Sequence, residues 1–93
     1  MIKAVKKIVI IGIGDVGFTV LKQLNNLADD IEIIAINRRF PPYLKEYISS
    51  TNENNKITFV KADVIDETSV QKIIKKEKLN DISVLISTVG KAL

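Results

Sequence analysis

Residues 7–17 read Lys7-Ile8-Val9-Ile10-Ile11-Gly12-Ile13-Gly14-Asp15-Val16-Gly17, an apolar run that leads into three spaced glycines. Continuous apolar runs are typical of strands that are covered on both faces, as the strands of a parallel sheet are. The glycines follow the spacing G-x-G-x-x-G directly after this run, where a strand would turn into a helix. The segment therefore predicts a buried strand, a tight turn and the beginning of a helix.

Apolar residues recur at helical spacing after the glycines and predict a helix from about residue 15 to residue 28. The stripe expected to face the rest of the protein consists of Val16, Val20, Leu24 and Leu27, with Leu21 widening it. These residues follow one another at intervals of three and four, which places them on one side of a helix. The segment therefore predicts an amphipathic helix packed on a sheet.

Three further runs, rich in apolar and β-branched residues, have the length and composition of strands. They occupy residues 31–36, 56–62 and 82–87. Together with helices predicted between them, they form the alternation β-α-β-α-β-α-β. Such alternation predicts an α/β fold with a parallel sheet, helices on both faces and right-handed crossovers, in the strand order 3-2-1-4.

Two more helices are predicted between these strands. Pro41-Pro42 blocks a strand and favours a short helix over residues 43–50. Asp66 caps a helix that runs to about residue 78. The side chains expected to face the sheet from these helices are Leu44, Tyr47, Ile48, Val70, Ile73, Ile74 and Leu79.

The composition of the 93 residues is that of a globular domain, with 46% apolar and 27% charged residues. Cysteine and histidine are absent, which excludes disulfides, thiolate metal sites and the commonest general base. No apolar run approaches the roughly 18 residues needed to span a bilayer. The net charge of +3 is mild, and aromatic platforms for stacking bases are lacking. We expect a soluble, cytoplasmic protein that binds neither membranes nor nucleic acid.

The glycine motif predicts a site for a dinucleotide, because each glycine has a separate task there. Gly12 permits the tight turn, Gly14 leaves the backbone open to a pyrophosphate, and Gly17 lets the helix approach the strand. The backbone amides near Asp15 and Val16, with the positive end of the helix dipole, favour phosphate groups. The alternative is a glycine-rich turn that joins a strand to a helix and binds no ligand.

The residues after the second predicted strand indicate which dinucleotide is bound. An acidic residue about 20 positions beyond the glycines normally binds the ribose hydroxyls in NAD proteins. This chain has Asn37 there, followed by Arg38 and Arg39. No carboxylate repels a 2′-phosphate, and guanidinium groups pair with one. The segment therefore favours NADP over NAD, with Arg38 the stronger candidate because it lies nearer the strand; a solvated arginine pair is the alternative.

Two further strand ends complete the predicted site, because ligands of such sheets lie outside the carboxyl ends of the strands. Asp63 follows the third strand and could accept a hydrogen bond from the adenine amino group. Ser87 and Thr88 end the fourth strand and could offer hydroxyls, and Gly90 would let the chain pass close to the cofactor. Ordinary turns at the strand ends are the alternative.

These segments together resemble the short-chain dehydrogenase/reductase superfamily over nearly the whole chain. Residues 36–39 look like the segment after the second strand in NADP-preferring members, and Asp63-Val64 looks like the family's Asp-Val pair, whose Asp contacts adenine. Ser87-Thr88-Val89-Gly90 stands where the family has Asn-Asn-Ala-Gly, and the glycine spacing also departs from the T-G-x-x-x-G-x-G pattern of most such enzymes. The chain is also similar to the NADP-binding part of saccharopine-dehydrogenase-like reductases, which have G-x-G-x-x-G and an arginine after the second strand.

The resemblance implies a Rossmann-type domain that binds NADP for a hydride-transferring enzyme. The family's Tyr-x-x-x-Lys pair is missing, because Tyr43 and Tyr47 are followed four residues later by Tyr47 and Thr51. We therefore assign no catalytic and no metal-binding residue. Residues 1–93 are expected to form the N-terminal cofactor-binding half of a longer oxidoreductase.

Two other functions stay open, namely a regulatory nucleotide-sensing domain like those that gate potassium transporters and a small basic nucleic-acid module. The regulatory domains usually keep an acidic residue where this chain has Asn37. The fourth strand should form an open sheet edge, which favours pairing between copies of the chain. We therefore expect a homo-oligomer or a tendency to aggregate.

Overall fold

The computed structural model describes residues 6–27, 30–50, 55–63, 67–76 and 82–88 of the chain. Strands and helices alternate along it as the sequence predicts, and no described boundary differs from its predicted place by more than two residues. The elements are β1 (Lys6–Ile11), α1 (Asp15–Leu27), β2 (Ile31–Asn37), α2 (Pro42–Ser50), β3 (Lys56–Lys61), α3 (Glu67–Lys76) and β4 (Ile82–Ser87).

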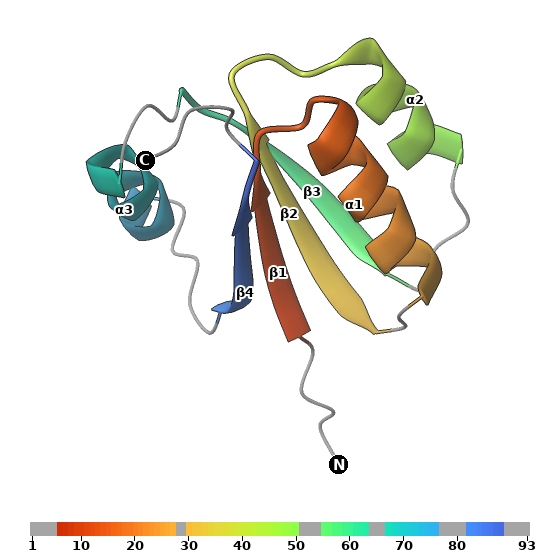
Figure 1. The fold of residues 1–93 in the computed structure, drawn as a ribbon, viewed down its shortest axis with the longest axis horizontal. Helices are drawn as coiled ribbons and strands as arrows, with labels where there is room; N and C mark the ends of the chain where they lie inside the picture. The colour runs from red at the N-terminus through yellow and green to blue at the C-terminus, as the bar shows by residue number, and fades with distance from the viewer. Residues whose placement is uncertain (1–5, 28–29, 51–54, 64–66, 77–81, 89–93) are drawn as a thin grey trace.

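The four strands form one parallel sheet in the order β3-β2-β1-β4 (Figure 1). The register pairs Ile10 of β1 with Ala35 of β2 and with Ile86 of β4. The chain crosses from the β3 edge to the β4 edge by way of α3, so that the strand order reverses between β1 and β4. This confirms the predicted strand order and defines a Rossmann-like α/β fold.

The sheet is covered on both faces, with α1 and α2 on one side and α3 on the other (Figure 1). Alternate residues of a strand point to opposite faces, which is why the central strands must be apolar throughout. The buried core under α1 and α2 contains Ile8, Ile10, Ile13, Leu21, Ile31, Ile33, Ala35 and Leu44. The core under α3 contains Val9, Ile11, Ile34, Ile36 and Ile73.

Two residues of the stripe predicted on α1 lie outside the core. Val16 is 66% exposed and Leu27 is 85% exposed, so their predicted burial is wrong. The predicted stripe residue Leu21 is buried, Val20 and Leu24 pack against the core, and Gly17 is the other buried residue of α1. Successive helical residues are rotated by about 100°, so the close approach of Gly17 to the sheet turns its neighbour Val16 toward solvent. Leu27 is the last residue of the helix, where few neighbours remain to cover it.

The inner faces predicted for the other helices agree with the structure at most of the positions that it describes, while Ile74 of α3 is half-buried. Leu44 is buried, and Tyr47 and Ile48 pack beside it. On α3, Ile73 is buried and Val70 packs against the same core. The expected cap Asp66 and the expected core residue Leu79 lie outside the described residues.

The β4 edge of the sheet exposes apolar side chains on both faces. Val84 is 45% exposed and Leu85 is 47% exposed, and neither position carries a charge. Uncharged edge strands are prone to pair with another chain. Association through this edge stays a prediction. Among the described helices, none is long and apolar enough to cross a membrane.

Candidate nucleotide-binding site

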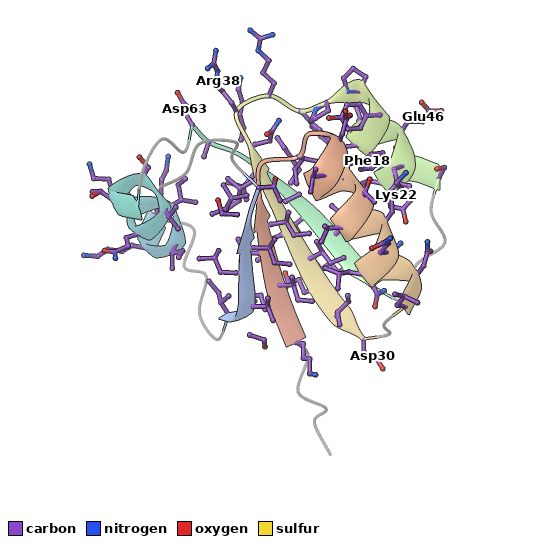
Figure 2. The ribbon with its side chains drawn as sticks, viewed as in Figure 1. Phe18, Lys22, Asp30, Arg38, Glu46 and Asp63 are labelled. Carbon is purple, nitrogen blue, oxygen red and sulfur yellow. The ribbon has the colours of Figure 1, made fainter. Side chains whose placement is uncertain are left out.

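The carboxyl ends of all four strands lie along the same end of the sheet, since the strands are parallel (Figure 1). This carboxyl-end edge is distinct from the lateral edges formed by β3 and β4. Chain segments that are distant in the sequence meet at this edge, namely the glycine turn, the segment after β2, the segment after β3 and the end of β4. Figure 2 shows Arg38 and Asp63 at this same end of the sheet, both on its outer surface. In open α/β sheets, this edge next to the reversal of strand order is where ligands bind.

The glycine turn begins with Gly12, whose φ of 87° lies in the region that favours glycine. The Gly12 amide donates to the Ile36 carbonyl at 2.8 Å, which extends the sheet by one bond beyond β1. Two residues later the Gly14 carbonyl accepts the first helical bond, from the Phe18 amide at 2.8 Å. The chain thus passes from strand to helix within three residues, and α1 starts directly at the carboxyl ends of the strands.

The inner side of the turn has no room for a side chain at Gly17. A Cβ atom built there would lie 2.0 Å from the Gly12 carbonyl oxygen and 2.9 Å from the Thr88 hydroxyl oxygen. Real Cβ atoms do not approach backbone oxygens so closely, so α1 would have to move away from β1. Gly17 therefore sets how near the beginning of α1 lies to the end of β1.

The outer side of the turn is open at Gly14. A Cβ atom built there would meet no atom within 4 Å. Asp15 and Val16 follow it as exposed residues in the first turn of α1. The first amides of a helix have no partner inside the helix, and the helix dipole places partial positive charge beside them. An anion that approached Gly14 would reach these amides without meeting a side chain at that position.

Asn37 ends β2 between the glycine turn and the arginine segment. Its side-chain oxygen accepts a hydrogen bond from the Ile13 amide at 3.1 Å, and its side-chain nitrogen donates to the Arg39 carbonyl at 2.7 Å. Its backbone carbonyl accepts from the Ala62 amide at 2.9 Å, next to Asp63. Asn37 therefore holds together three of the four segments at this edge.

Both arginine side chains and the Asp63 carboxylate are exposed to solvent. Arg38 points away from the sheet at the carboxyl end of β2 (Figure 2). The guanidinium of Arg38 and the carboxylate of Asp63 are thus available at the same edge as the open glycine turn. Charged groups of opposite sign at this edge can pair with a phosphate and with an amino group respectively.

The end of β4 supports the glycine turn from the opposite side. The Thr88 hydroxyl donates to the Gly12 carbonyl at 2.5 Å, and the Thr88 amide donates to the Ile11 carbonyl at 2.9 Å. A hydroxyl has one hydrogen to donate, and Thr88 donates it within the protein. Ser87, by contrast, is exposed to solvent. Val64, Val89 and Gly90, which the sequence places in the site, lie outside the described residues.

Tyr43 is a contributor to this edge that the sequence patterns did not indicate. Its hydroxyl donates to the Ile13 carbonyl at 2.5 Å, and its ring centroid lies 4.8 Å from that of Phe18. Ile13 itself is buried, and its peptide groups are bonded on both sides, to Tyr43 and to Asn37. Tyr43 is 42% exposed, and its hydroxyl joins α2 to the turn across 30 residues of sequence.

No family model, no curated protein and no solved structure matches this chain. The fold and the geometry of the glycine turn therefore carry the assignment by themselves: a Rossmann-like α/β domain whose carboxyl edge is compatible with nucleotide binding. Within the described residues, no group of three or more acidic side chains is arranged to hold a metal ion.

Proposed function

We propose that this chain binds the adenosine and pyrophosphate part of NADP. The observation that carries the proposal is the difference between the two sides of the glycine turn. Gly17 is required by packing, whereas Gly14 faces open space directly before α1. An open, side-chain-free position at a helix N-terminus is what the pyrophosphate of a dinucleotide needs, because its oxygens bond to backbone amides there.

The choice of NADP rests on the segment that follows β2. Asn37 brings no negative charge to this edge, and the exposed Arg38 lies beside it. A guanidinium can form two parallel hydrogen bonds with phosphate oxygens, and both partners are charged. Such a contact contributes about 1.5–3 kcal/mol, which corresponds to roughly one to two decades in affinity.

Asp63 and Ser87 are the proposed partners for the adenine and the ribose side of the ligand. Asp63 follows β3, the neighbour of β2, and its exposed carboxylate can accept a hydrogen bond from the adenine amino group. Ser87 ends β4 beside β1 and keeps an exposed hydroxyl. In the reductases that the sequence resembles, the bound nicotinamide supplies the hydride chemistry, and the protein positions it. We propose the same division of work for the longer enzyme to which such a domain would belong.

The test compares 2′-phospho-AMP with AMP by titration calorimetry on the purified chain. We expect the phosphorylated ligand to bind at least about tenfold more tightly, since it adds one charge-assisted contact. Arg38→Ala should remove most of this difference. Lys72→Ala serves as the matched control, because Lys72 is an exposed cation on α3, over the other face of the sheet.

Each result of this titration points to a different reading of the site. Equal affinities for the two ligands in the wild-type chain would exclude the NADP preference. If both ligands bind, the same result would favour a domain that senses NAD or adenine nucleotides. Loss of selectivity in Lys72→Ala as well as in Arg38→Ala would indicate a general effect of net charge.

A further inference from the structure

The side-chain amide of Asn37 joins the two loops that the proposed site assigns to different parts of the ligand. Its oxygen accepts from the Ile13 amide of the glycine turn, and its nitrogen donates to the Arg39 carbonyl of the arginine segment. The two distances, 3.1 Å and 2.7 Å, are those of ordinary hydrogen bonds. The half-buried side chain is therefore occupied on both of its polar atoms by protein backbone.

The two contacts together require an amide at position 37. One partner is a donor, the Ile13 amide, and the other is an acceptor, the Arg39 carbonyl. An asparagine satisfies both, whereas an ionised carboxylate has acceptors alone and would set an oxygen against the Arg39 carbonyl. Turning the amide over would oppose donor to donor and acceptor to acceptor, so the orientation follows from the partners.

The Asn37 contact holds the Ile13 amide of the glycine turn, whereas other groups hold the rest of this residue. Its carbonyl accepts the Tyr43 hydroxyl, and its side chain fills the core under α1 and α2. Loss of the Asn37 contact would leave the part-buried Ile13 amide without this acceptor. A shift of the turn toward a new partner would then move the open position at Gly14 relative to Arg38.

We propose that Asn37 is a positioning residue that couples the glycine turn to the arginine segment and so sets the preference for a 2′-phosphate without contacting the ligand. This inference rests on the proposed function and deepens it. It differs from a purely electrostatic role, in which Asn37 matters because it is not a carboxylate. On the electrostatic view, any uncharged residue at position 37 would preserve the preference. On the positioning view, an uncharged residue that cannot bridge the two loops loses it.

The deciding variants are Asn37→Ala and Asn37→Ser, which are uncharged and cannot reach both partners. We expect the ratio of affinities for 2′-phospho-AMP and AMP to fall from at least about tenfold to about threefold or less in both. Asn37→Ser keeps a hydroxyl at the strand end, so it provides the test if the alanine variant does not fold. Asn26→Ala is the matched control, because Asn26 is an exposed asparagine near the far end of α1, and it should keep the wild-type ratio.

Hydrogen exchange of the Ile13 amide provides a second measurement that needs no ligand. We expect this amide to exchange at least about tenfold faster in Asn37→Ser than in wild type, while the amides of the β1 core keep their rates. Wild-type exchange at Ile13 in the serine variant would show that the Asn37 side chain does not hold the Ile13 amide, whatever the nucleotide affinities are. Faster exchange with an unchanged affinity ratio would overturn the link to selectivity. Equal affinities in the wild-type chain would exclude the proposed NADP preference and the link of Asn37 to it. Fast Ile13 exchange in the variant would still support the role of Asn37 in holding the glycine turn.

Discussion

Gly14 and Gly17 lie one helical turn apart on the same strand-to-helix connection, and their surroundings are opposite. A Cβ atom at Gly17 would collide with the backbone of Gly12, whereas a Cβ atom at Gly14 would meet nothing within 4 Å. Neither Gly14 nor Gly17 has a positive φ, which Gly12 alone adopts among the described glycines, so backbone conformation does not demand glycine at either position. Packing explains Gly17 and leaves Gly14 unexplained by the protein itself.

The contrast separates what the fold needs from what a ligand needs within one motif. A domain that merely joined a strand to a helix would require Gly12 for the turn and Gly17 for the close approach. Any small residue, such as serine or alanine, would fit at Gly14, and serine would cap α1 better than glycine does. The open glycine is therefore the part of the motif that supports the proposed nucleotide site.

The largest expected effect is that of Gly17→Ala on stability. The new methyl group would overlap the Gly12 carbonyl oxygen, which belongs to the backbone and cannot rotate away. We expect a loss of about 3 kcal/mol or more in the free energy of unfolding, at the upper end of what overpacking costs. Urea unfolding followed by circular dichroism measures it. A loss below about 1 kcal/mol would show that α1 can withdraw from β1 easily.

A smaller effect is expected from Thr88→Val, which tests the other neighbour of Gly17. Valine has nearly the shape of threonine but cannot donate to the Gly12 carbonyl, which the Thr88 hydroxyl contacts at 2.5 Å. We expect a loss of about 1–2 kcal/mol from removing a hydrogen bond in a part-buried place.

The matched control for this variant is Thr19→Val. The Thr19 hydroxyl also donates to a backbone carbonyl, that of Asp15, but on the exposed surface of α1, where water can replace it. Its loss should stay within about 0.5 kcal/mol. Equal losses in the two variants would mean that the Thr88 contact does not support the inner side of the turn.

Local patterns were sufficient to predict most of the fold, because hydrophobic periodicity and strand-helix alternation are properties of neighbouring residues. The apolar run through Ile8–Ile11 predicts a doubly covered strand, and the observed burial agrees. The predicted sheet order is that of the Rossmann-type fold, which the β-α alternation and the glycine motif indicate. The burial of Val16 was mispredicted, because its spacing fits the stripe. The close packing of its neighbour Gly17 turns Val16 toward solvent instead.

The contacts that shape the candidate site could not be predicted in the same way. Asn37 and Tyr43 reach Ile13 across 24 and 30 residues, and no periodicity connects positions so far apart. Its place after β2 indicated Asn37 as a site residue, and its lack of charge predicted a preference for a 2′-phosphate. Its partner Arg39 is local, two residues along the chain, whereas its partner Ile13 comes within reach once β1 and β2 are paired, since pairing brings the end of β2 beside the glycine turn.

The smallest expected change in stability, and the most informative one for function, is that of Gly14→Ala. No atom lies in the way of the added methyl group, and Gly14 has no positive φ to lose. Alanine is a poorer helix cap than glycine, but it also lowers the entropy of the unfolded chain. These two effects nearly cancel, so the free energy of unfolding should change by no more than about 0.5 kcal/mol.

The effect of Gly14→Ala on binding should be large, because the methyl group would occupy the space through which a pyrophosphate reaches the first amides of α1. We expect the affinity for NADP to fall at least about tenfold, which corresponds to about 1.4 kcal/mol, while urea unfolding stays close to that of the wild-type chain. This combination separates Gly14 from Gly17, where lost binding would accompany lost stability. A destabilisation as large as that of Gly17→Ala would erase the contrast between the two glycines. Unchanged NADP affinity in a stable variant would mean that the ligand does not approach the turn at Gly14, and the proposed function would lose the observation that carries it.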